Sequence, residues 1–589
     1  MKFHLKKLAM VGLLVVTTAY AATVLSPNQN NQSGQIPSGY ADLSFKVSDG
    51  NWTKNLYLPT QPKNGDLLTI ESNAGYKTYV DTLKSDLPVD ILELSRGDAY
   101  TFKYSATEKL WKIQVSEQFP TNGVSQATVE VGKDKVSKFV VADGQWTGTI
   151  RLPDQAVDGQ FIAVESRAAY NTKIDTSNLL FNSNFNLKRG QTYWFKYNNS
   201  LQKWIPEQIQ PLAVDVRAVN TSKPETAVTA LEFGATTISQ VNLPTQANDR
   251  DRIIVTSTGA RPKKINSANL ATKATMSVNK GDRFEFMYVA DKAHWVLVSA
   301  PETKYSAYQF SSGVIPEITK PVTRVTVTNN NYLPVINLPS KAQIDDKIIV
   351  NSTANNSFDI AATGLNRKVV SGEKVRFVYT ASGWQVASNT IDILLVNSLS
   401  VSDTLGKQAS KIRLLESMSL TNETAENSDA NFYVRHVGYL NYTIPTPDND
   451  LNTALTNSRD DKTIQNERKR LKADGVLYQG TEGGKGCGWA YVKASSYNMT
   501  ANQNLACGIT AARHEFGHNL GVHHDDYKDG SNRGFNHSLG STALGGNSLP
   551  YYSSPNSYSP KYGVRLGEEG VTDALKAINA HAPTVSAYY

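Results

Sequence analysis

Alternating apolar and polar residues dominate the first two thirds of the chain and predict short β-strands. Segments such as Thr101–Tyr104 and Arg376–Tyr379 alternate at every step, and Asp-Gly, Asn-Gly and Lys-Gly pairs separate such segments. A period of two residues places successive side chains on opposite faces of a strand, and Gly-containing pairs favour turns. We therefore expect short antiparallel strands between about residues 44 and 388.

The same anchor residues recur four times in this region. In each copy a Leu-Pro pair is followed by a Ser fourteen residues after the Leu, then by a Gly with a Phe-x-Tyr triplet, and finally by a Trp. Repetition at fixed offsets indicates tandem copies of one structural unit. The Leu anchors are Leu58, Leu152, Leu243 and Leu338, and the closing tryptophans are Trp111, Trp204, Trp295 and Trp384.

Each copy is long enough to bury a core of its own, so we predict four small all-β sandwich or barrel domains. Their aromatic anchors have two interpretations: a platform on which sugar rings stack, or the apolar core, which is the more common role. Weak contacts in tandem copies would add up through multivalency. The predicted repeats cover residues 44–118, 130–210, 213–302 and 305–388.

Residues 390–589 change to a pattern of longer helices and strands, which predicts an α/β catalytic domain. The apolar run Ile391–Val396 fits a buried strand. A long amphipathic helix is expected over Val401–Ala425, with Leu405, Ile412, Leu415 and Met418 near helical spacing. The order β-α-β-α-β is completed by a strand over Phe432–Tyr442, a helix over Asp450–Lys472 and a strand over Gly475–Tyr478.

The sequence HEFGHNLGVHHD, which begins at His514, contains the groups of a catalytic zinc site. His514 and His518 lie one helical turn apart and therefore share a helix face. Gly521 can leave the helix in a left-handed conformation that returns His524 to the same metal. Three histidines with an open fourth position are typical of catalytic Zn²⁺, and the long spacing HExxHxxGxxH is far more specific than HExxH alone.

Glu515 follows the first candidate ligand, which directs its carboxylate to the side where water would bind, so we assign it as the general base. His523 is expected to be a bystander or a residue of the cleft. The sequence thus predicts a zinc endopeptidase. The alternative is a glycan-binding adhesin with a vestigial metal site, but such a site would not need a base beside its metal.

The N-terminal residues 1–21 read as a secretory signal peptide, with a basic start, the apolar run Leu8–Val16 and small residues near Ala21. No later run approaches the ~20 apolar residues that cross a bilayer, so we expect a soluble, exported protein without a transmembrane segment. Residues 22–43 read as a linker. The net charge of +7 is small for 589 residues, and its Lys and Arg are dispersed, so no nucleic-acid partner is expected.

The chain contains two cysteines, Cys487 and Cys507, both shortly before the histidine motif. In an oxidising compartment we expect them to form one disulfide at the rim of the active site, with two free thiols as the alternative. No cysteine precedes Cys487, so a propeptide thiol cannot bind this metal.

The last third of the chain resembles the metzincin peptidases, nearest to the secreted bacterial reprolysin-like and peptidyl-Asp endopeptidase groups. Their pattern of Cys-Gly-x-Ala-Tyr, a second Cys and a zinc helix matches residues 487–491, Cys507 and the motif at His514. With its repeats, the whole chain is similar to exported bacterial metallo-endopeptidases that act on glycosylated host proteins such as coagulation factors. The resemblance implies glycan-binding-like domains, passage through the periplasm, type II secretion and a dedicated membrane-bound chaperone; we expect a monomer.

The chain departs from this family at one position. Metzincins carry a methionine in a tight turn beneath the zinc, but no Met follows Met499. The segment from Thr542 to Tyr552 resembles that turn and places Leu544 at the methionine position. Leu and Met have similar volumes, so the exchange costs under about 1.5 kcal/mol. Tyr551 and Tyr552 have either a role at the zinc or a packing role.

Overall fold

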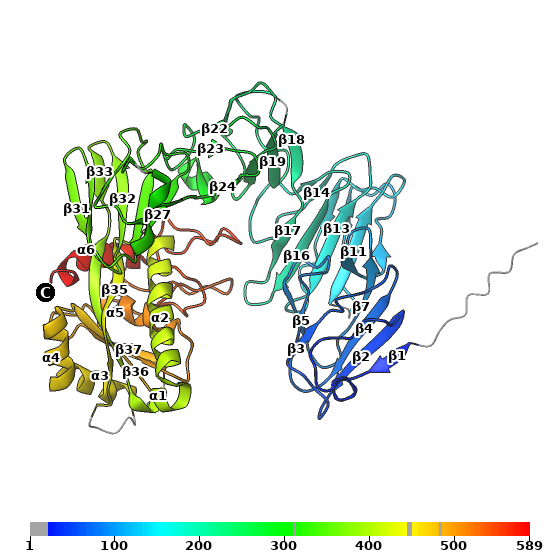
Figure 1. The fold of residues 1–589 in the computed structure, drawn as a ribbon. Helices are drawn as coiled ribbons and strands as arrows, with labels where there is room; N and C mark the ends of the chain where they lie inside the picture. The colour runs from blue at the N-terminus through cyan, green and yellow to red at the C-terminus, as the bar shows by residue number, and fades with distance from the viewer. Residues whose placement is uncertain (1–21, 133–134, 235, 311, 445–449, 482–485) are drawn as a thin grey trace, which may run out of the picture. The chain divides into compact units, whose positions relative to one another are not determined.

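The computed structural model describes residues 22–132, 135–234, 236–310, 312–444, 450–481 and 486–589. The chain forms two compact units, one of Met1–Leu180 with Leu187–Gln210 and one of Phe181–Asn186 with Pro211–Tyr589 (Figure 1). The expected signal peptide lies outside the described residues. Within them, no helix has both the length and the apolar character needed to span a bilayer.

Four β-sandwiches, modules 1 to 4, fill the first two thirds of the chain, as predicted. Each has a five-stranded sheet. In module 1 the spatial order is β1 (Thr23–Leu25), β2 (Asp42–Ser48), β4 (Leu67–Asn73), β7 (Ala99–Ser105) and β8 (Leu110–Ile113), and in module 2 it is β17 (Lys203–Ile209), β16 (Thr192–Asn198), β13 (Phe161–Ser166), β11 (Val136–Val141) and β9 (Glu117–Gln118). In module 3 the order is β18 (Leu212–Asp215), β19 (Val228–Phe233), β21 (Arg252–Ser257), β24 (Arg283–Val289) and β25 (His294–Ser299). In module 4 it is β26 (Thr303–Ser306), β27 (Val322–Val327), β29 (Lys347–Ser352), β32 (Lys374–Thr380) and β33 (Gly383–Val386).

A smaller sheet completes each sandwich. In modules 1, 3 and 4 it shares the apolar core of the larger sheet, and in module 2 its Ile150, Ile174 and Leu187 are buried. The smaller sheet of module 1 contains β3 (Asn55–Tyr57), β5 (Thr78–Asp81) and β6 (Ile91–Leu94), and that of module 2 contains β10 (Gln126–Thr128), β12 (Thr149–Arg151), β14 (Thr172–Ile174) and β15 (Asn186–Leu187). The smaller sheet of module 3 contains β20 (Gln240–Asn242), β22 (Lys263–Asn266) and β23 (Ser277–Val278), and that of module 4 contains β28 (Val335–Asn337), β30 (Phe358–Ala362) and β31 (Leu365–Val369). Short 3-10 helices are η1 (Asn28–Asn30), η2 (Ala290–Lys292), η3 (Ala307–Phe310) and η4 (Asn329–Asn331).

The expectation of purely antiparallel strands was wrong, because the sheets are mixed. In module 1, β2 pairs parallel with β4, whereas β4 pairs antiparallel with β7. Between β2 and β4 the chain crosses to the smaller sheet as β3 and then returns, which leaves the two neighbours pointing the same way. Alternation of apolar residues indicates a strand but carries no information about its direction.

Two module boundaries also differ from the expected ones. Residues Thr23–Leu25, predicted as part of the linker 22–43, form the edge strand β1, which pairs with β2. Strand β9 falls inside the predicted first repeat but pairs with β11 of module 2. Edge strands of two or three residues are too short to show a period, so the sequence pattern could not reveal them.

The repeated anchors form the cores of the modules, which confirms the core interpretation over the sugar-stacking one for these residues. The four Phe anchors, from Phe102 to Phe377, are fully buried. In modules 2 to 4 the closing tryptophan donates its indole N–H to the proline carbonyl of the Leu-Pro pair, as Trp204 does to Pro153 at 2.8 Å. The Gly anchors have positive φ, and each N–H donates to the Ser anchor's carbonyl, as in Gly190 to Ser166 at 2.7 Å.

The C-terminal domain is built on one five-stranded sheet with the order β35-β34-β36-β38-β37. Only the edge strand β37 runs antiparallel to its neighbour. The strands are β34 (Asn389–Asn397), β35 (Phe432–Asn441), β36 (Gly475–Gly480), β37 (Gly488–Ala490) and β38 (Thr500–Asn504), and the helices are α1 (Leu399–Leu405), α2 (Lys407–Asn427), α3 (Leu451–Asp460), α4 (Lys462–Leu471), α5 (Ala511–Asn519) and α6 (Ala574–Val585).

Helices cover both faces of this sheet, so the predicted α/β class is confirmed. Ile393 and Leu395 of β34 belong to a core with residues of α2, α5 and α6, whereas Leu394 and Val396 belong to a second core with residues of α3 and α4. Figure 1 shows α2 and α5 on one side of the strands and α3 and α4 on the other. Helix α5 thus lies against the sheet's larger core.

The long helix expected over Val401–Ala425 is two helices, α1 and α2, because Gly406 between them has a φ of 84° and a ψ of 148°. Of the four apolar positions expected to face the core, only Met418 is buried there. Leu405, Ile412 and Leu415 are exposed, while small hydroxyl side chains such as Ser417 are buried and donate to the helix's own carbonyls. The helix over Asp450–Lys472 is likewise divided, into α3 and α4.

Module 4 is joined to the C-terminal domain by a set of ion pairs as well as by the chain itself. Arg324 and Lys374 both pair with Glu426 near the end of α2, the former at 2.8 Å. Lys347 pairs with Asp429 at 2.6 Å, and buried Arg376 pairs with the same carboxylate. These basic residues lie on the five-stranded sheet of module 4, which therefore docks directly on the domain that contains the histidine motif.

Candidate active site

Three imidazoles meet at the C-terminal end of α5. His514 and His518 lie on the same face of the helix, and Gly521, with a φ of 96°, ends it in the left-handed region and allows the chain to return His524. The Nε2 atom of His514 lies 3.1 Å from that of His518 and 3.0 Å from that of His524, and the last two are 3.1 Å apart. The cluster has the spacing of a site that could hold one metal ion.

The other ring nitrogens fix how two of these imidazoles are oriented. Nδ1 of His514 lies 2.6 Å from the Ala543 carbonyl, and Nδ1 of His518 lies 2.7 Å from the Val522 carbonyl. Because a carbonyl can only accept, each Nδ1 carries the proton, and each Nε2 offers a lone pair to the centre. Burial lowers the pKa of His514 to about 4 and that of His518 to about 3, which keeps both rings neutral, as metal binding requires.

Glu515, which follows His514 on α5, is almost completely buried, and burial raises the pKa of its carboxyl well above the usual range. Gly488 of strand β37 packs against it. A Cβ at Gly488 would lie 2.6 Å from Glu515 Oε1 and 2.5 Å from the Asn502 carbonyl, so a side chain there would displace the carboxylate or the strand. The Cys-Gly motif thus has a steric role that its sequence alone did not indicate.

His523 lies outside the cluster. Its ring stacks on Tyr527 with centroids 3.7 Å apart, and its backbone N–H donates to the Asn532 carbonyl at 2.8 Å. Its ring is therefore not one of the three that converge, and its role as a bystander or a residue of the cleft stays a prediction.

The turn around Leu544 forms the floor of the site. Leu544 is buried, and a Cβ at Gly517, between the two helical histidines, would lie 2.4 Å from its Cδ2 atom. Tyr552 is fully buried, and its hydroxyl donates to the Arg513 carbonyl at 2.9 Å, which is a packing role. Tyr551 is half-buried, and its carbonyl accepts from Ala543 N at 2.7 Å.

Arg513 and Asn547 hold this turn against α5, and sequence reasoning missed both. The Nε atom of buried Arg513 donates to Asn547 Oδ1 at 2.6 Å, and its Nη2 atom donates to the Asn547 carbonyl at 2.7 Å. The Asn547 amide in turn donates to the Thr510 carbonyl, just before α5, at 2.9 Å. The only sequence signal was the position of Arg513 directly before His514.

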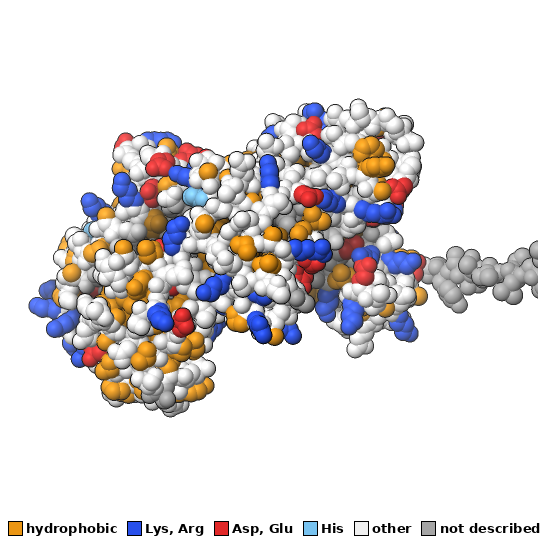
Figure 2. Space-filling view, turned by 90° about the horizontal axis from the view of Figure 1, so that it is seen from above, with side chains coloured by type: hydrophobic (Ala, Val, Ile, Leu, Met, Phe, Trp, Pro, Cys, Tyr) orange, Lys and Arg blue, Asp and Glu red, His pale blue; other side chains and the backbone are white. Residues whose placement is uncertain are grey.

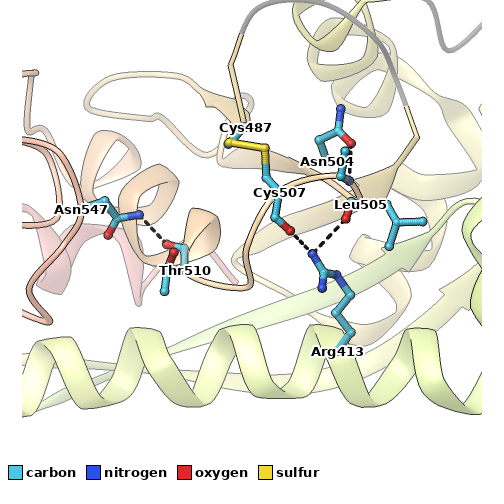
Figure 3. The surroundings of a disulfide bond; sticks show 8 residues. Arg413, Cys487, Asn504, Leu505, Cys507, Thr510 and Asn547 are labelled. Carbon is cyan, nitrogen blue, oxygen red and sulfur yellow. Dashed lines mark hydrogen bonds between the residues drawn. A yellow bond between two sulfur atoms is a disulfide. The ribbon is translucent and has the colours of Figure 1, made fainter. Parts of the chain in front are cut away.

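The expected disulfide is present, between Cys487 and Cys507, and it joins the start of β37 to the loop before α5 (Figure 3). From α2, Arg413 Nη2 donates to the Leu505 carbonyl at 3.2 Å and to the Cys507 carbonyl. The disulfide and this guanidinium therefore restrain the two segments that flank Glu515.

A cleft of about 910 Å³ lies elsewhere in the same unit, where modules 3 and 4 meet the C-terminal domain, and its lining includes Lys347, Arg376 and Asp429 but none of the three imidazoles. On the face seen in Figure 2, Lys and Arg side chains are scattered among acidic and apolar ones. This cleft is therefore separate from the three imidazoles at α5.

Comparison with known proteins matches the four modules and the C-terminal domain to two different protein families. Residues 41–115, 134–208, 235–299 and 320–388 each match the β-sandwich domain of the metalloprotease StcE. Residues 387–561 match metallo-peptidase family M12, of the reprolysin type. The chain therefore belongs to the M12 metallopeptidases, with four StcE-type β-sandwich domains ahead of its peptidase domain.

A solved structure of a chaperone–substrate complex contains a chain that is 45% identical to this one, with a TM-score of 0.90. The match covers 96% of this chain and 100% of that chain. A crystal structure of part of StcE from enterohemorrhagic E. coli is 28% identical over 13% of this chain and 62% of its own, with a TM-score of 0.11, and adds nothing on the fold. No curated protein sequence matches the chain.

Proposed function

We propose that the protein is a zinc-dependent endopeptidase in which His514, His518 and His524 bind one Zn²⁺ and Glu515 is the general base. The observation that carries the proposal is the near-equilateral arrangement of three Nε2 atoms, two of them on the helix that also carries the buried Glu515. Three imidazoles suit zinc and leave a coordination position for water and substrate. When bound, Zn²⁺ would polarise the scissile carbonyl and lower the pKa of water at the site.

Glu515 supplies the proton transfers. Its carboxylate accepts a proton from the attacking water, and the resulting acid donates that proton to the leaving amine, so that one group serves both steps. The Ala543 and Val522 carbonyls keep two imidazoles in the tautomer that the reaction needs throughout.

The edge strand β37 is where we place the substrate backbone. It is the terminal strand of the sheet, and its Gly488 lies against Glu515. An extended peptide that pairs with such an edge gains main-chain hydrogen bonds and carries its scissile bond past the carboxylate.

The substrates we propose are extracellular glycoproteins, including O-glycosylated host proteins such as coagulation factors. Support comes from the StcE-type modules and from the signal-peptide pattern of residues 1–21. Export would pass through the periplasm and type II secretion. A dedicated membrane-bound chaperone is a proposed partner, supported by the 45% identity to a chain of a chaperone–substrate complex.

Casein digestion tests the enzyme assignment. The wild-type protein should cleave casein, lose activity with a chelator and regain it when Zn²⁺ is added. Glu515→Ala should keep one bound zinc per chain and the wild-type circular dichroism but lose about 10²–10⁴-fold in rate, as expected for a general base. A Glu515→Ala protein that cleaves at the wild-type rate would exclude Glu515 as the base.

A further inference from the structure

Modules 1 and 2 carry the same cluster of side chains at the surface, in which a partly buried tryptophan lies beside an exposed tyrosine. In module 1, Tyr76 packs beside Trp52 with ring centroids 5.6 Å apart, and in module 2 Tyr170 packs beside Trp146 at 5.7 Å. The tyrosines are 71% and 70% exposed, so most of each ring faces solvent. None of these rings belongs to the repeated core anchors.

An acid and a base flank each aromatic pair. Asp49 pairs with Arg96 in module 1, and Asp143 lies 3.8 Å from Arg189 in module 2. Both carboxylates are fixed by a backbone bond, since Asp49 accepts from Gly75 N at 2.6 Å and Asp143 from Ala169 N at 2.8 Å. Each acid opens an Asp-Gly hairpin turn whose Gly has a positive φ. The two clusters therefore agree in residue type, position and contacts.

A further shared detail is that the indole N–H groups of Trp52 and Trp146 are covered but have no acceptor within the described residues. Modules 3 and 4 lack the cluster. At the Trp and Tyr positions module 3 has Thr237 and Arg261, and module 4 has Tyr332 and Asn356. Tyr332 donates its hydroxyl to the Ser357 carbonyl within its own module. The fold does not need the cluster, because two of its four copies form without it.

We propose that the two clusters, Asp49/Trp52/Tyr76/Arg96 and Asp143/Trp146/Tyr170/Arg189, are paired carbohydrate-binding sites for glycans of the substrate. A pyranose ring has an apolar face of C–H groups that fits an exposed aromatic ring, and hydroxyls that donate to a carboxylate and accept from a guanidinium. Because each carboxylate is paired with its own guanidinium, neither pair carries a net charge, which favours an uncharged sugar over an anionic one.

Both sites belong to one compact unit, in which Val136, Phe161, Ala163 and Trp194 of module 2 pack against the apolar core of module 1. Their binding to a densely glycosylated protein is therefore bivalent, and the second contact gains from an increased effective concentration. This inference rests on the proposed function only in taking glycoproteins as the substrates.

Surface plasmon resonance on immobilised mucin, glycosylated or enzymatically deglycosylated, tests the proposal with the full-length Glu515→Ala chain, so that cleavage cannot interfere. Tyr76→Ala and Tyr170→Ala should each speed dissociation from glycosylated mucin at least about tenfold, since each converts a bivalent contact into a monovalent one. The double variant should lose binding, while Tyr76→Phe should retain it, because the phenylalanine keeps the ring.

Tyr308→Ala in module 4 is the matched control, because Tyr308 is also 70% exposed but has no such cluster; it should bind as the parent does. Equal binding to deglycosylated mucin, or undiminished binding by the Tyr76→Ala/Tyr170→Ala double variant, would overturn the proposal. Casein cleavage by the double variant with Glu515 restored should stay at the wild-type rate. Failure of the peptidase assignment would appear in that casein assay and not in the binding measurement.

Discussion

Helix α5 and the turn around Leu544 meet across the candidate site but contribute to it in different ways. Helix α5 and the Gly521 turn supply the side-chain atoms that face the centre. The Leu544 turn supplies a carbonyl that orients His514 and a side chain that fills the space beside Gly517. Helix α5 and the Gly521 turn therefore determine which metal ion the site can bind. The Leu544 turn determines how accurately the imidazoles are held. Substitutions in the two regions should therefore affect different measurements.

The largest effect is expected from His518→Ala, which removes one of the three lone pairs. Saturating Zn²⁺ at about 1,000 times its Kd stabilises a protein by about 4 kcal/mol, and this variant should lose most of that stabilisation. Thermal unfolding with and without Zn²⁺ gives the measurement. His523→Ala is the control, because that ring stacks on Tyr527 outside the cluster; a comparable loss of zinc there would contradict the assigned ligand set.

The second-largest effect is expected from removal of the disulfide, which restrains both segments that flank Glu515. Replacing both cysteines, Cys487→Ser with Cys507→Ser, opens a loop with a sequence separation of 20 residues. It should lower the free energy of unfolding of this domain by about 2–4 kcal/mol. Urea titration followed by tryptophan fluorescence measures the change, and a reductant should weaken the wild type but have no further effect on the double variant. Equal sensitivity of both proteins to reductant would argue against this account.

A smaller effect is expected from Gly517→Ala, which changes the contact between α5 and the Leu544 turn. Its Cβ would meet Leu544 Cδ2, and we expect a loss of about 1–3 kcal/mol from overpacking in spite of the better helix propensity of alanine. The double variant with Leu544→Ala should be more stable than the sum of the single changes allows, as a double-mutant cycle in denaturant would show. If the two changes in the free energy of unfolding simply add, the Cβ at position 517 does not clash with the Leu544 side chain.

The smallest effect is expected from Leu544→Met, which introduces the residue that metzincins carry in this turn. The two side chains have similar volumes, so stability should change by under about 1.5 kcal/mol, and zinc content should stay at one per chain. Calorimetry and metal analysis provide the test. A loss of zinc would show that the side chain at this position does more than fill space.

Features with a strict local spacing could be predicted from the sequence. The histidine motif predicted the clustering of His514, His518 and His524 because helix geometry and one left-handed glycine determine it. The repeats predicted the sandwiches because the same buried contacts recur in every copy. Arg513, Asn547 and Gly488 were missed because their roles depend on segments that meet only in the folded domain.

Predictions from the sequence failed where one pattern of residues is compatible with two different structures. Apolar spacing over Val401–Ala425 indicated one helix, but Gly406 divides the segment. It also placed Leu405, Ile412 and Leu415 in the core together with Met418, whereas only Met418 is buried, because buried hydroxyls that bond within the helix take the other positions. Aromatic residues in the modules were correctly assigned to the core, but a second set, with Tyr76 and Tyr170, lies on the surface. Only the structure separates the two sets.

The docking of module 4 has a practical consequence for anyone who wishes to isolate the peptidase. A fragment that begins at residue 387, where the M12 match starts, would leave Glu426 and Asp429 without Arg324, Lys347, Lys374 and Arg376. Ending it at residue 561, where the match stops, would also remove α6, whose Ile578, Ala582 and Val585 lie in the main core. The smallest piece that can work as an enzyme is therefore longer, at both ends, than the stretch that matches family M12.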